Sequence, residues 1–599
     1  MSDRIKIVIL GAGYGGVHTA KKLSKKYKKN NNVEITLIDR NPFHTLMTEL
    51  HEVAGGRVDK ESVMVDLRTI FHGSKVNIIT ENIEKVDIEG QKVTTEYNTY
   101  QYDYLVVGTG SETAYFGVPG VKENGFSLWS LEDALTIREH IENMFKAASK
   151  ERNDSRRKEL LTLIVAGAGF TGIETIGELM EWKTRLSKEH NVDEKEVRLM
   201  VVEAMPSILN MLNKDQAGKV ERYMAKKGIE LMKNAPIVEV TPNLVKLKDG
   251  TEIPSRTLIW TCGIQGNAEA SELNLEMGKR GRLQTNKYMQ SVSKENIFVV
   301  GDIAWYEENG KPTPQIVEAA MQTGETVAKN IEAAIEKKEK VEFKSNYHGF
   351  MVSVGGRYGV ADVGGMKLSG FFAMAMKHLV NMHYLFGIGG FLLIYNYLCH
   401  EFFYMKDERS IMRGHLAARS STLWLVVLRL YIGTMWVIEG VTKISQGWLS
   451  PEHIYIVSTT NVSGASQQAA EGAAQAANTV VPLLANPPAF YTAFMNTFIA
   501  PYAYFFQVTI VLGEVAIGLA LLAGLFTFLA SAGSIFLCFN FILSAMGGKE
   551  ILWYIFGAVA LMGGAGRAFG LDYYVIPWFW RTFGKIAYGK RKPIYTKDA

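Results

Sequence analysis

Two glycine-rich turns carry the residue types best suited to binding a dinucleotide. The first, GAGYGG, runs from Gly11 to Gly16, after an apolar run at 5–10 and before a helical pattern at 17–23. A strand, a glycine-rich turn and a helix in this order are typical of the dinucleotide-binding fingerprint. The glycines permit a tight turn and let a pyrophosphate approach the backbone, and the helix N-terminus offers N–H groups to the phosphates. We therefore expect this turn to bind a nucleotide cofactor.

An acidic residue closes the second strand after each glycine turn. The strand expected over 33–38 ends in Asp39, which suits a ribose 2′-hydroxyl. The pattern then repeats, with an apolar run at 161–166, GAGFTG at 167–172, and a strand at 197–202 that ends in Glu203. The distance in sequence from each glycine turn to its acid exceeds the usual ~20 residues, because polar inserts at 25–32 and 183–196 lengthen it. Because a carboxylate repels a 2′-phosphate, Glu203 favours NADH over NADPH.

Two further turns follow expected strands. The strand at 104–107 leads into GTGSE, where small residues let the backbone approach a cofactor closely. The strand at 297–300 leads to Gly301 and Asp302, ahead of a helix at 318–335. Asp302 is either a turn residue or a carboxylate that contacts the polyol chain of a flavin. The stretch NPFHTLMTELHEVAGG, where many flavoprotein disulfide reductases carry a redox cysteine pair, has no cysteine, so no dithiol relays electrons there.

Composition narrows the class of protein. A chain of 599 residues is long enough for several domains, and its apolar residues concentrate in the last 180 positions. The net charge of only +4 gives no sign of a nucleic-acid partner. The three cysteines, Cys262, Cys399 and Cys538, fit a reducing compartment, and we expect no metal site. The first apolar run is too short for a signal peptide and is better explained as a strand.

Six motifs keep a familiar order along residues 4–400. They are GAGYGG, GTGSE, GAGFTGIETIGE, VVEA, VVGDIAW and AAMQTGETVAKNI. This order resembles that of the type II NADH:quinone oxidoreductases, which are FAD/NAD(P)-binding pyridine nucleotide oxidoreductases. The resemblance implies two Rossmann-type domains, non-covalent FAD, NADH as substrate, and reduction of a menaquinone-type quinone without proton pumping.

The resemblance also assigns cofactor contacts. FAD would contact the first turn, the acid after it and three later segments: Gly11, Ala12, Gly13, Tyr14, Gly15, Gly16, Asp39, Arg40, Ile83, Gly110, Asp302, Ala319 and Ala320. NADH would contact the second turn and its acid: Gly167, Gly169, Gly172 and Glu203.

The resemblance assigns catalytic roles to four side chains near the nicotinamide, the quinone or the flavin. Glu174 matches a glutamate near both pockets, or it is a helix-start carboxylate stabilised by the helix dipole. Gln322 keeps the family's second glutamine, whereas Glu318 replaces the first. In an apolar mouth Glu318 would have a raised pKa and could carry a proton to reduced quinone, or it is a solvated helix residue. Lys377 matches a basic residue that reaches the flavin, or it snorkels at a membrane surface.

Long apolar runs mark the C-terminal part of the chain. The run at 379–398 is near the ~20 residues of a membrane span but is interrupted by GIGG. Four further runs, at 422–444, 501–523, 525–546 and 551–570, look long enough to span. Lysine and arginine flank this group on both sides and are absent from 445–500. Because positive residues mark the cytoplasmic side, we expect four spans with both ends inside and an interfacial helix at 379–398.

The expected fold is α/β, with an α-helical membrane domain of four transmembrane helices. We expect an FAD-binding domain at 1–118 and 286–345, an NADH-binding domain at 119–285, a quinone-side anchoring segment at 346–405, and a membrane domain at 406–599. The membrane domain resembles the DoxX family in helix number and in LRLYIGTMWVIEGVTKI. Arg429, Glu439 and Glu514 would pair or line a polar site, because charges inside a membrane are costly; Glu439 and Lys443, one turn apart, could pair as simple structure. The alternative interpretation is that these charged residues form a second quinone or electron-acceptor site.

The sequence thus predicts a multi-pass cell-membrane NADH:quinone oxidoreductase with its catalytic domain on the cytoplasmic face. Its expected partners are a menaquinone-type quinone and the bilayer, with a homodimer as the candidate oligomer and no nucleic acid. Three alternatives stay open. One is a sulfide:quinone oxidoreductase-like enzyme, which would need cysteines near the flavin where only Cys262 occurs. The others are a non-catalytic membrane module and a dedicated feeder of electron export to extracellular acceptors.

Overall fold

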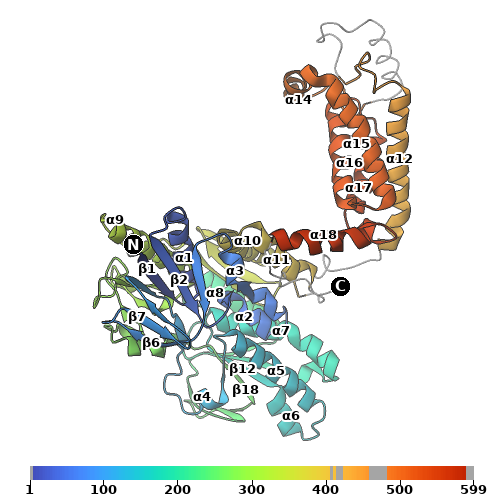
Figure 1. Cartoon of the computed structure of the whole chain (residues 1–599). Coiled ribbons are helices and arrows are strands. Elements are labelled where there is room, and N and C mark those ends of the chain that lie inside the picture. Colours follow the sequence, from blue (N-terminus) through green and yellow to red (C-terminus); the bar gives the residue numbers. More distant parts are fainter. Residues whose placement is uncertain (1–3, 405–408, 413–421, 457–481, 588–599) are drawn as a thin grey trace. The chain divides into compact units, whose positions relative to one another are not determined.

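The computed structural model describes residues 4–404, 409–412, 422–456 and 482–587. The chain divides into two compact units, Met1–Ala418 and Arg419–Ala599 (Figure 1). Each unit buries hydrophobic clusters of its own, so each is described by itself.

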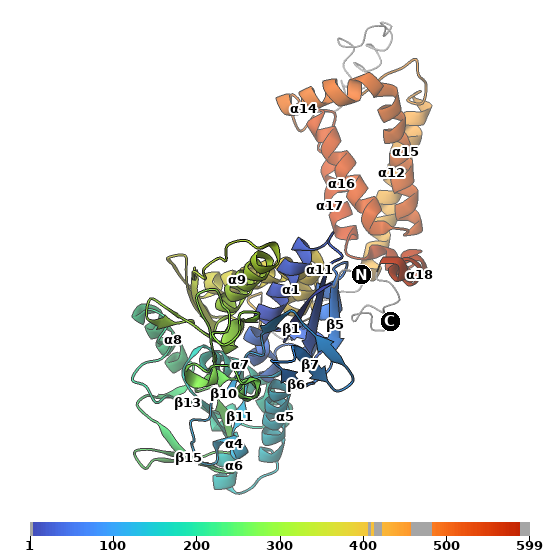
Figure 2. The ribbon, with the colours of Figure 1, turned by 60° about the vertical axis from the view of Figure 1, so that its left-hand side comes forward.

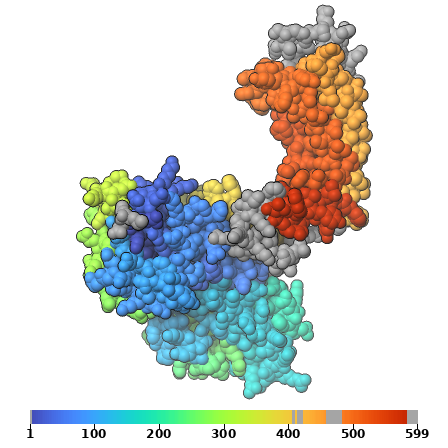
Figure 3. Space-filling model, in the orientation of Figure 1, coloured from blue at the N-terminus to red at the C-terminus, as the bar shows by residue number. Residues whose placement is uncertain are grey.

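The N-terminal unit begins with a parallel five-stranded sheet. Its strands, in order β21–β9–β1–β2–β5, are Ile297–Val299, Tyr104–Val107, Ile5–Leu10, Val33–Asp39 and Val76–Thr80. They are apolar runs covered by helices, as parallel sheets require. Helices α1 (Tyr14–Lys26) and α9 (Val317–Glu336) pack together, with the Thr19 hydroxyl 3.2 Å from the Gly324 carbonyl. Strand β21 and helix α9 lie far along the chain from the other elements of this domain, so two separate stretches of chain build it. The space-filling view shows these two stretches side by side, the first in blue and the second in yellow-green (Figure 3).

A second parallel five-stranded sheet repeats this plan. Its strands, in order β11–β18–β12–β13–β14, are Phe126–Ser127, Thr257–Trp260, Thr162–Ala166, Arg198–Val202 and Glu230–Met232. Its helices are α4 (Val121–Asn124), α5 (Leu131–Ala148), α6 (Asp154–Leu161), α7 (Phe170–His190) and α8 (Lys214–Lys226). The antiparallel strands β15 (Ile237–Thr241), β16 (Leu244–Leu247) and β17 (Glu252–Pro254) lie between β14 and β18 in the chain. The two sheets confirm the predicted Rossmann-type α/β fold.

Short elements complete the two sheet domains. One antiparallel sheet joins β6 (Ile83–Asp87), β7 (Lys92–Thr95) and β8 (Thr99–Gln101). Helices α2 (Leu50–Ala54) and α3 (Leu67–Ile70) follow the first βαβ unit. The remaining strand pairs are β3 (Phe43–Thr45) with β4 (Met64–Asp66), β10 (Ser111–Thr113) with β19 (Ile264–Gly266), β20 (Leu283–Gln284) with β22 (Ala304–Trp305), and β23 (Glu307–Glu308) with β24 (Lys311–Pro312).

The N-terminal unit ends in a small sheet and two apolar helices. Strands β25 (Gly349–Ser353), β26 (Gly359–Val363) and β27 (Met366–Ser369) precede α10 (Phe371–Gly389) and α11 (Phe391–Leu398). The two helices are separated at Gly390, which has a φ of +70° that favours glycine. The GIGG motif therefore breaks the apolar run, as predicted. These helices leave large apolar side chains exposed: Phe371, Phe372, Leu379, Val380, Phe386, Phe391, Leu392 and Tyr395.

The C-terminal unit is helical (Figure 2). Its helices are α12 (Leu425–Ser445), α14 (Ala489–Phe494), α15 (Ala503–Ala523), α16 (Thr527–Leu543), α17 (Ile551–Leu561) and α18 (Asp572–Ala587). Glycines let α12 and α15 approach closely, because a Cβ on Gly440 would lie 2.6 Å from Cγ2 of Val515. Among the described residues, two helical stretches are long and apolar enough to cross a membrane, Thr422–Ser445 and Ala489–Ala523. The expected spans at 525–546 and 551–570 correspond to the shorter helices α16 and α17, so the four-span arrangement stays a prediction.

Charged residues inside this unit pair differently from the simplest expectation. Lys443 binds Glu514 of α15, with Nζ 2.6 Å from Oε1, and not Glu439 one turn away on its own helix. The close packing of α12 on α15 brings this more buried acid within reach. Arg429, also buried, donates hydrogen bonds to the carbonyls of Ala565 and Phe569 at 3.0 Å.

Candidate cofactor and quinone-side site

The first glycine turn is shaped by backbone contacts that exclude side chains. Gly11 has a φ of +92°, and a Cβ there would lie 2.4 Å from the Gly108 carbonyl oxygen. A Cβ on Gly16 would lie 1.9 Å from the Gly11 oxygen. At Gly13, by contrast, an added Cβ would meet nothing within 4 Å, and no side chain caps the start of α1 there. The turn is thus closed toward the protein and open on the side where a pyrophosphate would approach.

The second glycine turn repeats these contacts. Gly167 has a φ of +94°, and a Cβ there would lie 2.8 Å from the Thr261 carbonyl oxygen. A Cβ on Gly172 would lie 1.9 Å from the Gly167 oxygen, whereas one on Gly169 would meet nothing within 4 Å. Cys262, whose Cα is 3.0 Å from the same missing Cβ of Gly167, is exposed beside this turn. The two turns are equivalent in shape, which fits two dinucleotides.

The two acids that close the second strands make the same contact with their turns. Asp39 accepts a hydrogen bond from the Ala12 N–H through Oδ2 at 2.6 Å. Glu203 accepts one from the Ala168 N–H through Oε2, also at 2.6 Å. Burial raises the pKa of Asp39 above its ordinary value. Each carboxylate is therefore already fixed by the turn, and its remaining lone pairs can meet a ribose hydroxyl.

The third segment of the first domain brings several predicted residues together. Asp302, after β21, is half-buried and accepts a hydrogen bond from the Ser111 hydroxyl at 2.8 Å. Gly110, with a φ of +75°, again leaves open space beside it. Ala319 and Ala320 are buried in the first turn of α9, and the Ala320 Cβ lies 3.6 Å from where a Cβ on Gly301 would stand. This clustering of a carboxylate, open glycines and a helix N-terminus fits the polyol chain and ring of a flavin.

The other predicted FAD residues differ in their exposure. Tyr14 is buried, and its ring contacts those of His44 and Tyr384. His44 contacts the Ala12 carbonyl through Nδ1 and the Tyr384 hydroxyl through Nε2, both at 2.8 Å. Arg40 is exposed, and Ile83 is half-buried at the start of β6. The glycine turn is thus tied to α10 by a His–Tyr link that the sequence did not indicate.

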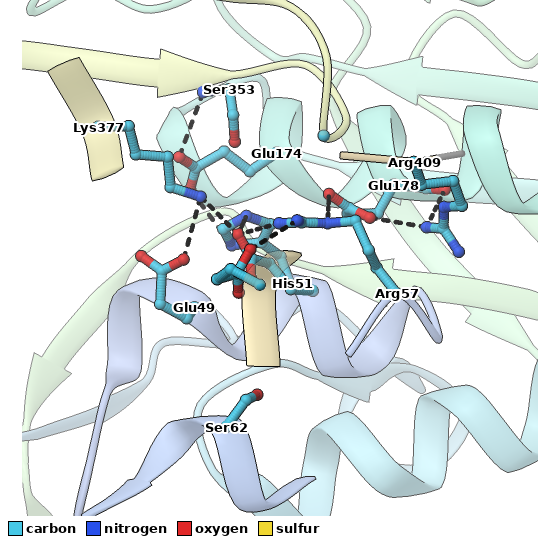
Figure 4. A network of polar contacts seen from close by, with 12 residues as sticks. Glu49, His51, Arg57, Ser62, Glu174, Glu178, Ser353, Lys377 and Arg409 are labelled. Atoms are coloured by element: carbon cyan, nitrogen blue, oxygen red, sulfur yellow. Dashed lines mark hydrogen bonds and ion pairs between the residues drawn. The ribbon is translucent and has the colours of Figure 1, made fainter. Parts of the chain in front are cut away.

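Lys377 lies in a network of buried charges (Figure 4). Its Nζ is 2.6 Å from Oε1 of Glu52 and 3.0 Å from Oε2 of Glu49. Although burial opposes the charged form, these two carboxylates raise the pKa of Lys377. Burial raises the pKa of Glu49 to about 8, whereas Arg57 and Lys377 overcome burial and hold the pKa of Glu52 well below its usual value. Lys377 is therefore a charged member of an internal network, and neither a snorkelling side chain nor one that extends freely toward a ligand.

Glu174 lies at the edge of the same network. Its Oε1 accepts a long hydrogen bond from the Ser353 N–H at 3.4 Å, and its Oε2 is 3.6 Å from Nδ1 of His51. Burial raises the pKa of Glu174 to about 8 and lowers the pKa of His51. At neutral pH this arrangement pairs a protonated carboxyl with a neutral imidazole.

Glu318 and Gln322, one turn apart on α9, both hold the segment before β25. Gln322 accepts a hydrogen bond from the Asn346 N–H at 2.9 Å and donates one to the Asn346 carbonyl at 2.7 Å. Glu318 accepts a hydrogen bond from the His348 N–H at 3.0 Å and also contacts the imidazole of His348. His348 is 66% exposed. Glu318 is therefore a partly solvated residue that pairs with an exposed histidine.

Sequence reasoning missed most of the buried charges. The network also contains Glu49, His51, Glu52, Arg57, Glu178, Glu181, Glu401 and Arg409. A signal was present, because Glu174, Glu178 and Glu181 recur at helical spacing on α7 among apolar residues. Three carboxyl groups on one face of a helix packed into a domain must be paired with buried cations or protonated.

Comparison with known proteins places residues 5–324 in the pyridine nucleotide-disulphide oxidoreductase family. The type II NADH:quinone oxidoreductase of Staphylococcus haemolyticus is 35% identical over 395 residues, which cover 65% of this chain and 97% of that protein. The Staphylococcus aureus (strain NCTC 8325 / PS 47) protein of the same name is 34% identical over the same lengths.

Two solved structures share the fold. NDH2 from Plasmodium falciparum in complex with NADH matches 67% of this chain and 99% of its own, with a TM-score of 0.60 and 16% identity. The sulfide:quinone oxidoreductase of Aquifex aeolicus matches 64% of this chain and 91% of its own, with a TM-score of 0.53 and 20% identity.

Proposed function

The chain belongs to the type II NADH:quinone oxidoreductases, and from this premise we propose that it oxidises NADH at a bound FAD and reduces a membrane quinone. The observation that carries the proposal is the pair of equivalent glycine turns, each closed toward the protein, open outward and joined to an acid. One nucleotide site would hold FAD and the other NADH.

FAD would supply the chemistry of electron transfer, and the chain would bind and orient. The N-terminus of α1 and the open face of Gly13 would hold its pyrophosphate, with Asp39 on the ribose. Asp302 would accept hydrogen bonds from the polyol chain. The N–H groups at the start of α9, at Ala319 and Ala320, would face the ring, where a helix N-terminus stabilises negative charge.

The second turn would bind NADH and discriminate against NADPH. Gly167, Gly169 and Gly172 would leave room for its pyrophosphate, as their counterparts do in the first domain. Glu203 would accept hydrogen bonds from the ribose and repel a 2′-phosphate. Its carboxylate is oriented for this by the Ala168 and Met205 N–H groups, at 2.6 and 2.8 Å.

On the quinone side, the proposed roles are proton retention and positioning. Reduction of a quinone to a quinol takes up protons, and Glu174, with a pKa raised by burial to about 8, holds one at neutral pH. Gln322 and Glu318 would fix the 346–348 segment at the entry, because both bind its backbone. Lys377 would keep a positive charge beside the site. We propose that the reaction moves no proton across the membrane, as the family resemblance implies.

The exposed apolar side chains of α10 and α11 support membrane association. Phe372 and Phe391 are 69% and 78% exposed, which suits burial among lipid chains. We place this face in the bilayer interface, where a quinone of the menaquinone type would enter. The C-terminal unit, whose sequence resembles the DoxX family, would cross the membrane four times with both ends in the cytoplasm.

The test is steady-state turnover of the detergent-solubilised protein with alternative donors and acceptors. We expect oxidation of NADH with a soluble menaquinone analogue, and a much lower rate with NADPH. Oxidation of sulfide but not of NADH would favour the sulfide:quinone alternative. Oxidation of neither donor would favour a non-catalytic membrane module.

A further inference from the structure

Arg409, on the segment that leads toward the C-terminal unit, is buried inside the N-terminal unit, with 5% of its surface exposed. Its Nη1 donates a hydrogen bond to the Gly55 carbonyl at 2.8 Å, and its Nη2 donates one to Oε2 of Glu178 at 2.7 Å. Its main chain is equally constrained, because a Cβ on Gly356 would lie 1.6 Å from the Arg409 carbonyl oxygen. The segment is therefore anchored in the core of the N-terminal unit.

Arg409 belongs to an alternating series of buried charges. Glu178 receives one guanidinium on each oxygen, from Arg57 at 3.0 Å on Oε1 and from Arg409 on Oε2. Arg57 also contacts Glu52, and Oε1 of Glu52 binds Lys377 at 2.6 Å. We call Arg409, Glu178, Arg57, Glu52 and Lys377 the buried charge chain. It connects the segment at 409–412 to the quinone-side lysine through direct contacts.

The charge chain depends on a balance at Glu178. The charged groups that face this carboxylate are Arg57, Arg409, Glu52 and Glu181; Glu401 lies behind Arg57, and Arg357 lies behind Glu181. Without Arg409, an ionised Glu178 would depend on Arg57 alone, which already serves Glu52 and Glu401. Because interactions between charges are strong where water is absent, the loss would pull Arg57 away from Glu52. Glu52 would then depend on Lys377, and the ammonium group would shift from Glu49 toward Glu52.

We propose that Arg409 is a positioning residue for the quinone-side site, acting through Glu178, Arg57 and Glu52 on Lys377. The proposal rests on the proposed function. It gives the segment beyond α11 a role in the reaction of the N-terminal unit. Arg409 itself would touch neither cofactor nor substrate.

The test separates the two half-reactions of the full-length protein by anaerobic stopped-flow absorbance. We expect Arg409→Met to slow reoxidation of reduced flavin by a menaquinone analogue about tenfold, because a small displacement of a site residue has effects of this size. Reduction of the flavin by NADH should stay within about twofold of the unaltered protein, since the NADH turn lies outside the charge chain.

The pH dependence of flavin reoxidation tests whether the charge on Glu178 causes the slowing. In Arg409→Met, protonation of Glu178 removes the uncompensated charge, so reoxidation should become faster as the pH falls from 9 to 6. The double variant Arg409→Met/Glu178→Gln should show no such dependence and should recover most of the rate, because a neutral amide needs no second cation. Arg409→Lys, which keeps the charge, should recover at least half of the rate.

The matched control is Arg198→Met, which removes an exposed arginine–glutamate pair with Glu230. It should change neither half-reaction. Unchanged reoxidation in Arg409→Met at every pH would overturn the proposal, as would equal slowing of both half-reactions without rescue by Glu178→Gln. If Arg409→Met loses its flavin, the double variant Arg409→Met/Glu178→Gln is tested instead. Slow reoxidation in this double variant, in which residue 178 is neutral, would also overturn the proposal. Absence of flavin reduction by NADH in the unaltered protein would instead refute the proposed function.

Discussion

The ammonium group of Lys377 on α10 and the carboxylate of Glu52 on α2 are in direct contact, 2.6 Å apart, although 325 residues separate them in the chain. Both side chains are buried. Helix α10 therefore carries exposed apolar residues on one side and a buried cation on the other. This ion pair fixes the apolar helix to the domain that carries the first glycine turn.

Replacing Lys377 should destabilise the N-terminal unit strongly. Lys377→Met leaves Glu52 and Glu49 buried without this cation, and breaking a buried pair costs about 3–5 kcal/mol. We expect a lower temperature of flavin release in a fluorescence melt. Lys377→Met/Glu52→Gln should be less destabilised than the single variant. A single variant that melts with the unaltered protein would show that the pair contributes little.

Glu203 should control the choice between NADH and NADPH. Glu203→Gln keeps an oxygen that can accept the Ala168 N–H but removes the charge, so we expect discrimination against NADPH to fall at least about tenfold. The measurement is kcat/KM for each nucleotide. Asp39→Asn, the same change at the equivalent acid, should weaken FAD retention and leave the nucleotide preference unchanged. An unaltered preference in Glu203→Gln would remove this residue from the NADH site.

Glu174 should make stability depend on pH. Its pKa in the folded protein, about 8, lies above the ordinary value of 4.5, so the native state favours the protonated form. Its contribution to stability is complete below pH 4.5 and is lost as the pH rises through 8, with a slope of at most about 1.4 kcal/mol per pH unit. Denaturation between pH 6 and 9 should show a smaller slope in Glu174→Gln, whereas Glu96→Gln at an exposed acid should not differ from the unaltered protein. Equal slopes in all three proteins would contradict the buried environment of Glu174.

The membrane arrangement can be tested by labelling from outside intact cells. Asn486 is exposed and lies in the predicted outer loop, at 445–500. With four spans, Asn486→Cys should react with a membrane-impermeant maleimide in intact cells. Glu89→Cys, at an exposed acid of the N-terminal unit, should react only after lysis. Labelling of residue 486 only after lysis would rule out the four-span arrangement.

The parts of the site that could be predicted are those whose chemistry is contiguous in sequence. Each glycine turn places a strand, a tight turn and a helix within a few residues, and the acids Asp39 and Glu203 end the next strand. The break at Gly390 was also legible, because glycine repeats interrupt an apolar run. These features depend on local backbone geometry, which sequence patterns report well.

The charge pairs could not be predicted, because tertiary packing decides them. Arg57 contacts Glu401 across 344 residues, and Arg409 contacts Glu178 across 231. Within the helical unit, sequence proximity suggested Glu439 for Lys443, whereas the packing of α15 supplies Glu514. The spacing of side chains along a helix predicts which face is buried, but it does not predict which element packs against that face.

In the proposed reaction, one bound flavin receives electrons from NADH and gives them to a quinone. The most direct measurement is an anaerobic titration of the purified protein with NADH, monitored through the visible absorbance of the bound flavin. We predict that about one equivalent of NADH bleaches the flavin and that a menaquinone analogue then restores its colour. A protein without flavin, or a flavin that NADH does not bleach, would contradict the account.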